Sequence, residues 1–133
     1  MPDPFLFELV SPEKLLLSEN TEMVVVPGAE GDFGVLIGHA PLISTLRSGV
    51  INIYAGKTID KRIFVAGGFA EVISERCTIL AEEAILVDDI DSREAQDRLN
   101  AAQSALETAT DETSRGKAEI ELATAIAMTN IDR

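Results

Sequence analysis

Hydrophobic and polar residues follow two different patterns along the chain, and the change falls near residue 88. Before it, short runs of β-branched, aromatic or alternating apolar residues are separated by Gly, Pro, Asn and Asp. The runs are FLFELV, KLLL, TEMVVVP, GVINIYA, KRIFVAGGFAEVI and CTILAEEAILV, with turns expected at YAGKT and IDKR. Closely spaced short strands without intervening helices are typical of an antiparallel sandwich or flattened barrel. We therefore expect residues 1–88 to form a β-sandwich domain.

From Asp89 onward the apolar positions take a helical period. Either Asp91 or Ser92 caps a first helix, in which apolar residues recur at alternating spacings of four and three. These positions are Ala95, Leu99, Ala102, Leu106 and Ala109. The polar segment TDETSRG then predicts a turn, followed by a second helix over roughly 114–129. Residues 89–133 are expected to form an α-helical hairpin, a small all-α domain after the β domain.

The second predicted helix is apolar on two nearly opposite sides. One side carries Ile120, Ala123, Ala127 and Ile131, and the other carries Leu122, Ala125 and Ile126. Such a helix needs two covers, of which one is the first helix and the other is either the sandwich or a partner protein. Because each alanine buries little area, we expect the hairpin to be less stable than the sandwich.

Composition and charge narrow the classes of partner. All six aromatic residues, all five prolines and eight of nine glycines precede residue 70, which agrees with a boundary near residue 88. Eleven basic and 23 acidic residues give a net charge of -12, so nucleic acid is not an expected partner. The same charge and the lack of an apolar run of about 18 residues exclude direct insertion into lipid. The opening segment MPDPFLFELVSPEK has no secretion signal.

The stretch VPGAEGDFGVLIGHAP, residues 26–41, holds four glycines and the single histidine. Neither a P-loop nor a dinucleotide pattern fits, because no Lys–Ser/Thr pair follows and the glycines are spaced three, three and four apart. We interpret these glycines as turn residues. His39 has no second histidine or cysteine pair for a metal and no G-x-S-x-G serine. The acidic residues between 82 and 91 lack a calcium-loop pattern, so we predict no catalytic group, cofactor or metal.

Two motifs in this order carry a family resemblance. Residues 31–42 read G-x-x-G-x-x-x-G-H-A-P-L, residues 67–72 read G-G-x-x-E-V, and the hairpin ends in AEIELATAIA. Over essentially the whole length, the chain resembles the epsilon subunit of bacterial F-type ATP synthase, whose mitochondrial counterpart is the delta subunit. The resemblance implies a non-catalytic rotor subunit of the central stalk, which couples c-ring rotation to ATP synthesis through gamma. It also implies a peripheral position at the cytoplasmic face of the bacterial inner membrane.

Single residues take roles from this resemblance. Gly31 and Asp32 match the loop that faces the c-ring in the family. Ser11, His39 and Ser44 match positions that face gamma. The family's C-terminal helices either lie folded on the sandwich or rise along gamma toward the alpha/beta hexamer and hinder ATP hydrolysis.

The hairpin departs from the family's ATP-binding pattern, I-D-x-x-R-A. Residues 90–95 read IDSREA, which places Arg93 one position early and Glu94 where the arginine is usual. Beyond Arg98 the only basic residues are Arg115, Lys117 and Arg133. We therefore expect a weak regulatory role for the hairpin; the alternative function is an ATP-sensing regulatory binding module on the same scaffold.

Overall fold

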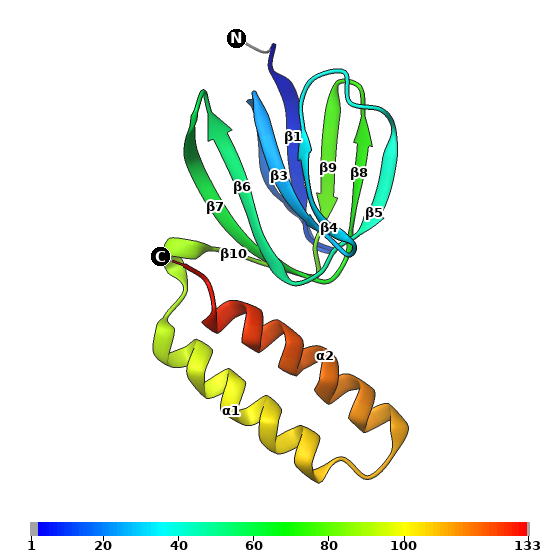
Figure 1. Ribbon diagram of the computed structural model, residues 1–133, viewed down its shortest axis with the longest axis vertical. Coiled ribbons are helices and arrows are strands. Elements are labelled where there is room, and N and C mark those ends of the chain that lie inside the picture. The colour runs from blue at the N-terminus through cyan, green and yellow to red at the C-terminus, as the bar shows by residue number, and fades with distance from the viewer. Residues whose placement is uncertain (1–2, 133) are drawn as a thin grey trace. The chain divides into compact units, whose positions relative to one another are not determined.

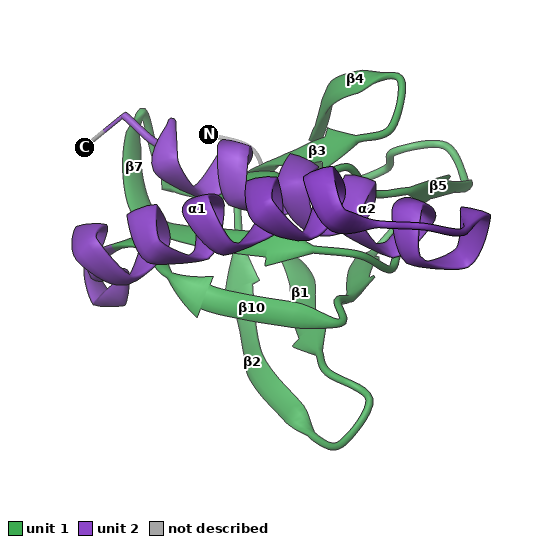
Figure 2. Cartoon of the chain, turned by 90° about the horizontal axis from the view of Figure 1, so that it is seen from below, with its two compact units in different colours: residues 1–87 green, residues 88–133 purple. Residues whose placement is uncertain are grey.

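A computed structural model describes residues 3–132, in which ten strands precede two α-helices (Figure 1). The chain divides into two compact units, residues 1–87 and 88–133 (Figure 2). The strands of the first unit are β1 (Phe5–Val10), β2 (Leu15–Thr21), β3 (Met23–Gly28), β4 (Gly31–Val35), β5 (Leu42–Thr45), β6 (Gly49–Ala55), β7 (Thr58–Ala66), β8 (Phe69–Ile73), β9 (Arg76–Leu80) and β10 (Glu83–Leu86). A 3-10 turn, η1 (Val87–Asp89), leads to α1 (Ser92–Thr108) and α2 (Glu112–Thr129).

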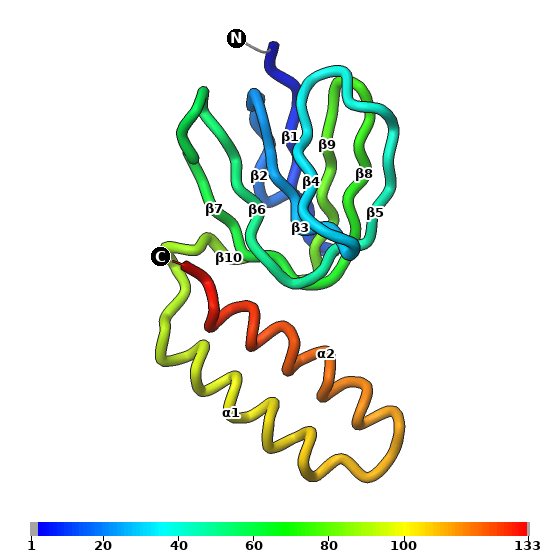
Figure 3. The backbone as a smooth tube through the Cα atoms, viewed as in Figure 1, coloured from blue at the N-terminus to red at the C-terminus, as the bar shows by residue number. Residues whose placement is uncertain are grey.

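The strands form two five-stranded sheets, which confirms the predicted β-sandwich. The first sheet has the order β2-β1-β9-β8-β5 and the second has the order β10-β7-β6-β3-β4. Neighbouring strands are antiparallel except for β1 and β9, which are parallel. The tube in Figure 3 lets the chain be followed from β5 of the first sheet into β6 of the second.

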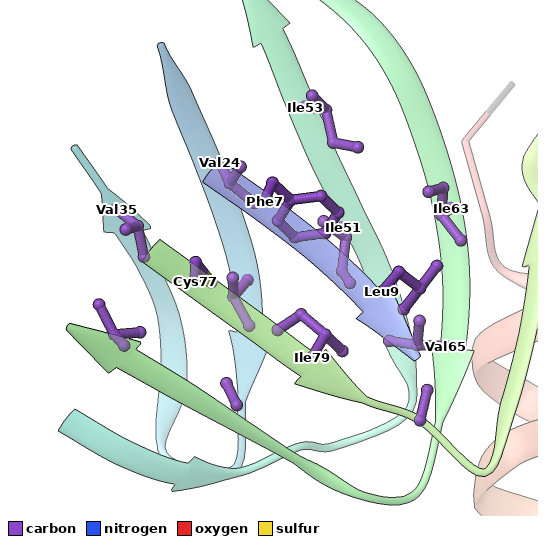
Figure 4. Close-up of a cluster of buried hydrophobic side chains, with 14 of the residues drawn as sticks. Phe7, Leu9, Val24, Val35, Ile51, Ile53, Ile63, Val65, Cys77 and Ile79 are labelled. Atoms are coloured by element: carbon purple, nitrogen blue, oxygen red, sulfur yellow. The ribbon is translucent and has the colours of Figure 1, made fainter. Parts of the chain in front are cut away.

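The core fills the space between the sheets, as the alternation of residues along β1 dictates. Phe5, Phe7 and Leu9 are buried while the residues between them are half-buried. Val24 from β3 and Ile51 from β6 close the core from the second sheet (Figure 4). A side chain of this kind contributes about 1.5–3 kcal/mol when fully buried, so the core supports the sandwich without disulfides.

Four sequence expectations for the strands were wrong, one of them for the run CTILAEEAILV, which forms two strands, β9 and β10. Glycine-rich residues 31–35 and the short segment 42–45 are strands, β4 and β5, although no strand was predicted there. The run KRIFVAGGFAEVI is two strands, because Gly67 and Gly68 take φ values of 73° and 97° and turn the chain between β7 and β8. The segment IDKR is not a turn but lies inside β7, where Lys61 Nζ donates to Glu19 Oε2 of β2 at 3.0 Å.

The helical hairpin has the predicted elements with one shifted boundary. Asp91, rather than Ser92, caps α1, since its Oδ1 accepts the Arg93 N–H at 2.8 Å. The second helix begins at Glu112, two residues before the predicted start, because Asp111 Oδ1 accepts the Ser114 N–H at 2.7 Å. The hydrogen bond from the Ser114 N–H lowers the pKa of the Asp111 carboxyl.

The two apolar sides of α2 differ in exposure. Ala118, Ala125 and Met128 are buried, as are Ala95 and Ala102 of the predicted seam of α1. Ile120, on the other side of α2, is 71% exposed. The first helix therefore covers one side of α2, and Ile120 lies on the side for which the sequence allows the sandwich or a partner protein as cover.

Candidate partner-binding surface

The β3–β4 turn presents Asp32 at the edge of the second sheet. Gly28 and Gly31 face each other across the hairpin. A Cβ at Gly28 would lie 2.8 Å from the Gly31 carbonyl oxygen and 2.9 Å from Phe33 Cε1, and Gly31 has a φ of 140°. Both positions therefore require glycine, while the Asp32 side chain remains 59% exposed.

Arg47, on the connection between β5 and β6, holds this turn from the side. Its Nη1 donates to the Gly28 carbonyl at 2.6 Å, and its Nη2 donates to Asp32 Oδ1. The Arg47 backbone N–H donates to the Pro27 carbonyl at 3.1 Å. Arg47 was not predicted as a site residue, because nothing in the sequence marks a residue 15 positions from Asp32 as its partner.

His39 lies in the segment between β4 and β5 and is half-buried. Its Nδ1 is 2.7 Å from the Ala40 carbonyl oxygen. The preceding residue, Gly38, has a φ of 81° and donates its N–H to the Ser74 carbonyl at 2.6 Å. The loop that carries His39 is therefore attached to the β8–β9 turn of the first sheet.

Ser44 lies on a strand of the first sheet, and Ser11 lies just beyond the end of another. Ser44 is on the edge strand β5, opposite Ala70, and its Oγ donates to the Thr45 carbonyl at 3.0 Å. Ser11 directly follows β1, and its Oγ accepts the Lys14 N–H at 3.2 Å. β5 and β1 are three strands apart, which is about 14 Å at the usual strand spacing. The three predicted gamma-facing residues are thus spread over one sheet rather than gathered in a cluster.

An apolar row that the sequence analysis also missed crosses the outer face of this sheet. The registers pair Phe69 with Leu80, Leu80 with Val10, and Val10 with Leu15. Phe69 is 41% and Leu15 is 54% exposed, whereas the neighbouring Ala70 points into the core. We call these four residues the apolar row; its signal in the sequence was the second set of apolar residues in each alternating strand.

Chemically reactive groups do not define this surface. Cys77 is buried, and desolvation raises the pKa of its thiol to about 12, so it is a neutral core side chain. Among residues 3–132, no group of three or more His, Cys, Asp and Glu side chains could hold a metal ion. The described helices include none that is long and apolar enough to cross a membrane.

One ion pair joins the two helices of the hairpin. Arg98 of α1 donates through Nη2 to Glu121 Oε2 of α2 at 3.1 Å and through Nε to Oε1. These hydrogen bonds lower the pKa of the Glu121 carboxyl. Glu94, at the position where the family's ATP-binding pattern has arginine, lies in the first turn of α1.

Comparison with known proteins agrees with this arrangement. Residues 4–87 match the family described as the ATP synthase delta/epsilon chain, beta-sandwich domain. The ATP synthase epsilon chain of Rhodospirillum rubrum is 55% identical over 121 residues, which are 91% of this chain and 89% of that protein. The ATP synthase epsilon chain of Paramagnetospirillum magneticum is 56% identical over 109 residues, 82% of each chain.

Solved structures show the same fold. A chain in the cryo-EM structure of the Euglena gracilis mitochondrial ATP synthase, with OSCP, F1 and c-ring, matches with a TM-score of 0.81 at 24% identity. The match covers 96% of this chain and 81% of that one. A chain of the Tetrahymena thermophila mitochondrial ATP synthase, in its central stalk and c-ring, matches with a TM-score of 0.64 at 15% identity.

Proposed function

This chain belongs to the delta/epsilon family of ATP synthase, and from that premise we propose that its sandwich joins gamma to the c-ring. It is a non-catalytic stalk subunit of the ATP synthase complex. In the proposed arrangement Gly31 and Asp32 contact the c-ring, while Ser11, His39 and Ser44 lie on the side of gamma. The subunit would then be peripheral to the membrane through the complex, at the cytoplasmic face of a bacterial inner membrane.

The observation that carries this proposal is that one compact unit offers two surfaces of different chemistry. The Asp32 turn is an exposed polar contact at the edge of the second sheet. In the apolar row on the first sheet, Phe69 and Leu15 are exposed large side chains of the kind that protein interfaces bury. A subunit that couples two partners needs two such surfaces joined by a well-packed core. The buried residues between the two sheets form such a core.

For the hairpin we propose at most a weak regulatory contact with the alpha/beta hexamer. Glu94 would repel a triphosphate at the position where the family's pattern has arginine. Arg98, the basic residue nearest that position in α1 after Arg93, is already engaged by Glu121. Both features weigh against the ATP-sensing alternative.

The test is charge reversal at the turn, Asp32→Lys, with Asp3→Lys as the matched control. Asp3 is also an exposed carboxylate, ahead of β1 and outside both proposed contacts. Purified chain, gamma and c-ring are mixed, and capture of each partner is measured separately together with the thermal melting of the chain. We expect Asp32→Lys to reduce c-ring capture about tenfold, since a displaced charge contact costs about 1.4 kcal/mol or more.

Gamma capture and melting temperature should remain those of the unmodified protein, because an exposed charge at the start of the edge strand β4 contributes little to the core. Asp3→Lys should change neither the capture of gamma nor the capture of the c-ring. Unchanged c-ring capture by a folded Asp32→Lys variant would refute the c-ring contact. Unfolding of the Asp32→Lys variant would show instead that Asp32 is needed for folding of the sandwich, and would contradict its assignment as a contact residue alone.

A further inference from the structure

The β5–β6 connection crosses from one sheet to the other directly beside the Asp32 turn. The Ala29 N–H donates to the Thr45 carbonyl at 2.9 Å, and the Arg47 backbone N–H donates to the Pro27 carbonyl at 3.1 Å. Gly28 and Leu46 form an isolated bridge between these hydrogen bonds. We call residues 45–47 the strap; Figure 3 shows the β3–β4 turn next to the end of β5 that leads into it.

We propose that Arg47 is a positioning residue for the rotor contact, fixing the Asp32 turn in place and connecting it through the strap to the first sheet. This inference rests on the proposed function of Asp32. Arg47 itself need not touch the c-ring. Its role is to fix the position of the Asp32 carboxylate before the c-ring binds.

The guanidinium holds both arms of the hairpin at once. Gly28 ends β3 and Asp32 is the second residue of β4, and Arg47 donates to both. A planar guanidinium with donors in fixed directions therefore constrains the distance between the arms and the rotation of the carboxylate. Because Arg47 Nη2 donates to Oδ1 of Asp32, we expect a partner to bind the other carboxylate oxygen, Oδ2.

The strap is anchored in the core of the sandwich. Leu46, between the two residues that bond the turn, is only 8% exposed, and its N–H donates to the Gly68 carbonyl at 3.1 Å. Gly68 precedes β8, which carries Phe69 of the apolar row. The strap therefore ties the turn to the first sheet through backbone hydrogen bonds.

An ion pair between half-exposed side chains would by itself contribute little. Arg47 is 45% and Asp32 is 59% exposed, and such pairs often have no measurable effect on global stability. The bond to the Gly28 carbonyl is different, since Gly28 is buried and its oxygen has a charged donor. We therefore expect Arg47 to govern local opening of the turn rather than unfolding of the whole unit.

The first experiment is amide hydrogen exchange on the full chain, free of partners. Arg47→Met removes the guanidinium and keeps the aliphatic stem, and Arg47→Lys restores the charge without the fork. Arg76→Met is the matched control, because Arg76 is 43% exposed and pairs with Glu8 across strands at 3.8 Å. The reporters are the amides of Ala29 and residue 47, which we call the strap amides because their hydrogen bonds join the strap to the turn. The Ala81 amide, which donates to the Val10 carbonyl, is the internal reference.

Exchange at both strap amides should be about three- to tenfold faster in Arg47→Met, intermediate in Arg47→Lys and unchanged in Arg76→Met. The Ala81 amide should not respond. Unchanged exchange at the strap amides of Arg47→Met would overturn the inference, whatever becomes of the Asp32 contact.

The second experiment is capture of the c-ring and gamma by the same variants. Arg47→Met should lose c-ring capture about three- to tenfold while gamma capture is kept, and Arg47→Lys should recover part of the loss. If Asp32→Lys abolishes c-ring capture but Arg47→Met does not, positioning by Arg47 is refuted and the Asp32 contact stands. If neither variant affects capture although the strap amides exchange faster, the proposed c-ring contact is wrong and the structural pinning by Arg47 stands.

Discussion

Replacing Glu121 with glutamine tests how the helical hairpin is held together. The substitution keeps the size of the side chain and removes the charge that pairs with Arg98. Glu121 receives two donors from one guanidinium, Nε and Nη2, which is the two-point geometry that makes such pairs strong. The alanine-rich contact between α1 and α2 buries few large side chains. An ion pair should therefore contribute a larger share of the stability of the hairpin than of the sandwich.

The expected magnitude follows from exposure. The Arg98 side chain is 27% and the Glu121 side chain is 44% exposed, so solvent screens much of the attraction. A paired site of this kind contributes about 0.5–1 kcal/mol, equivalent to about a two- to fivefold change in the opening equilibrium of the hairpin. Amide exchange of α2 at about pH 7, read at the buried Ala118 and Ala125, should be faster by that factor in Glu121→Gln.

The pH dependence identifies the cause. Hydrogen bonds from Arg98 lower the pKa of Glu121, so the folded carboxyl binds its proton less readily than the unfolded one. The stabilisation is therefore complete above the ordinary glutamate pKa, about 4.3, and is lost as the pH falls through the lowered value in the folded state. At sufficiently low pH the protein and the Glu121→Gln variant should exchange α2 amides at the same rate.

Glu119→Gln is the control, since Glu119 is an exposed carboxylate two residues earlier on the same helix. It should leave exchange of the Ala118 and Ala125 amides within about twofold of the unmodified protein. A Glu121→Gln effect of the same size at neutral and low pH would refute the reasoning, because a helix propensity or packing change does not titrate. An equal effect of Glu119→Gln would refute it as well.

The turn and the hairpin each give one further prediction. Gly28→Ala should destabilise the first unit by about 1–3 kcal/mol in urea unfolding, because its Cβ would meet the Gly31 carbonyl at 2.8 Å, whereas Gly34→Ala has nothing within 4 Å and should be neutral or slightly stabilising. Equal effects of the two would show that the turn yields to the added methyl. Removal of residues 89–133 should raise ATP hydrolysis by the reconstituted complex by less than about twofold, and an increase of tenfold or more would contradict a weak regulatory hairpin.

The class of fold could be predicted because both periodicities are strong. Alternating apolar residues in β1 and β9 have one buried side each, and the four-and-three spacing of α1 gives the buried Ala95 and Ala102. The polar segment IDKR misled because β10 pairs only with Ile63–Ala66, so the earlier part of β7 has no neighbour on that side. A strand portion without a neighbour can carry charge, and its local sequence then resembles a turn.

The site could be predicted only in part. Family resemblance supplied Asp32, His39 and Ser44 as candidates; Asp32 lies in β4, Ser44 lies in β5, and His39 lies in the segment between these strands. The apolar row was hidden because its members come from four strands and are adjacent only through the registers. Pairing between distant strands depends on packing of the whole sandwich, and composition or local spacing does not contain it.

Charge alone cannot explain recognition at the turn. Asp32 is one of 23 acidic residues in a chain with a net charge of -12, so a partner that responded only to negative potential would have many equivalent surfaces. What distinguishes Asp32 is that one crowded glycine, Gly28, one glycine with a φ of 140°, Gly31, and one guanidinium together set the place of its carboxylate at the edge of the sheet. Specificity at such a contact comes from a fixed geometry that lowers the entropy lost on binding. The residue that sets this geometry, Arg47, is therefore as much a part of the proposed contact as the carboxylate that it holds.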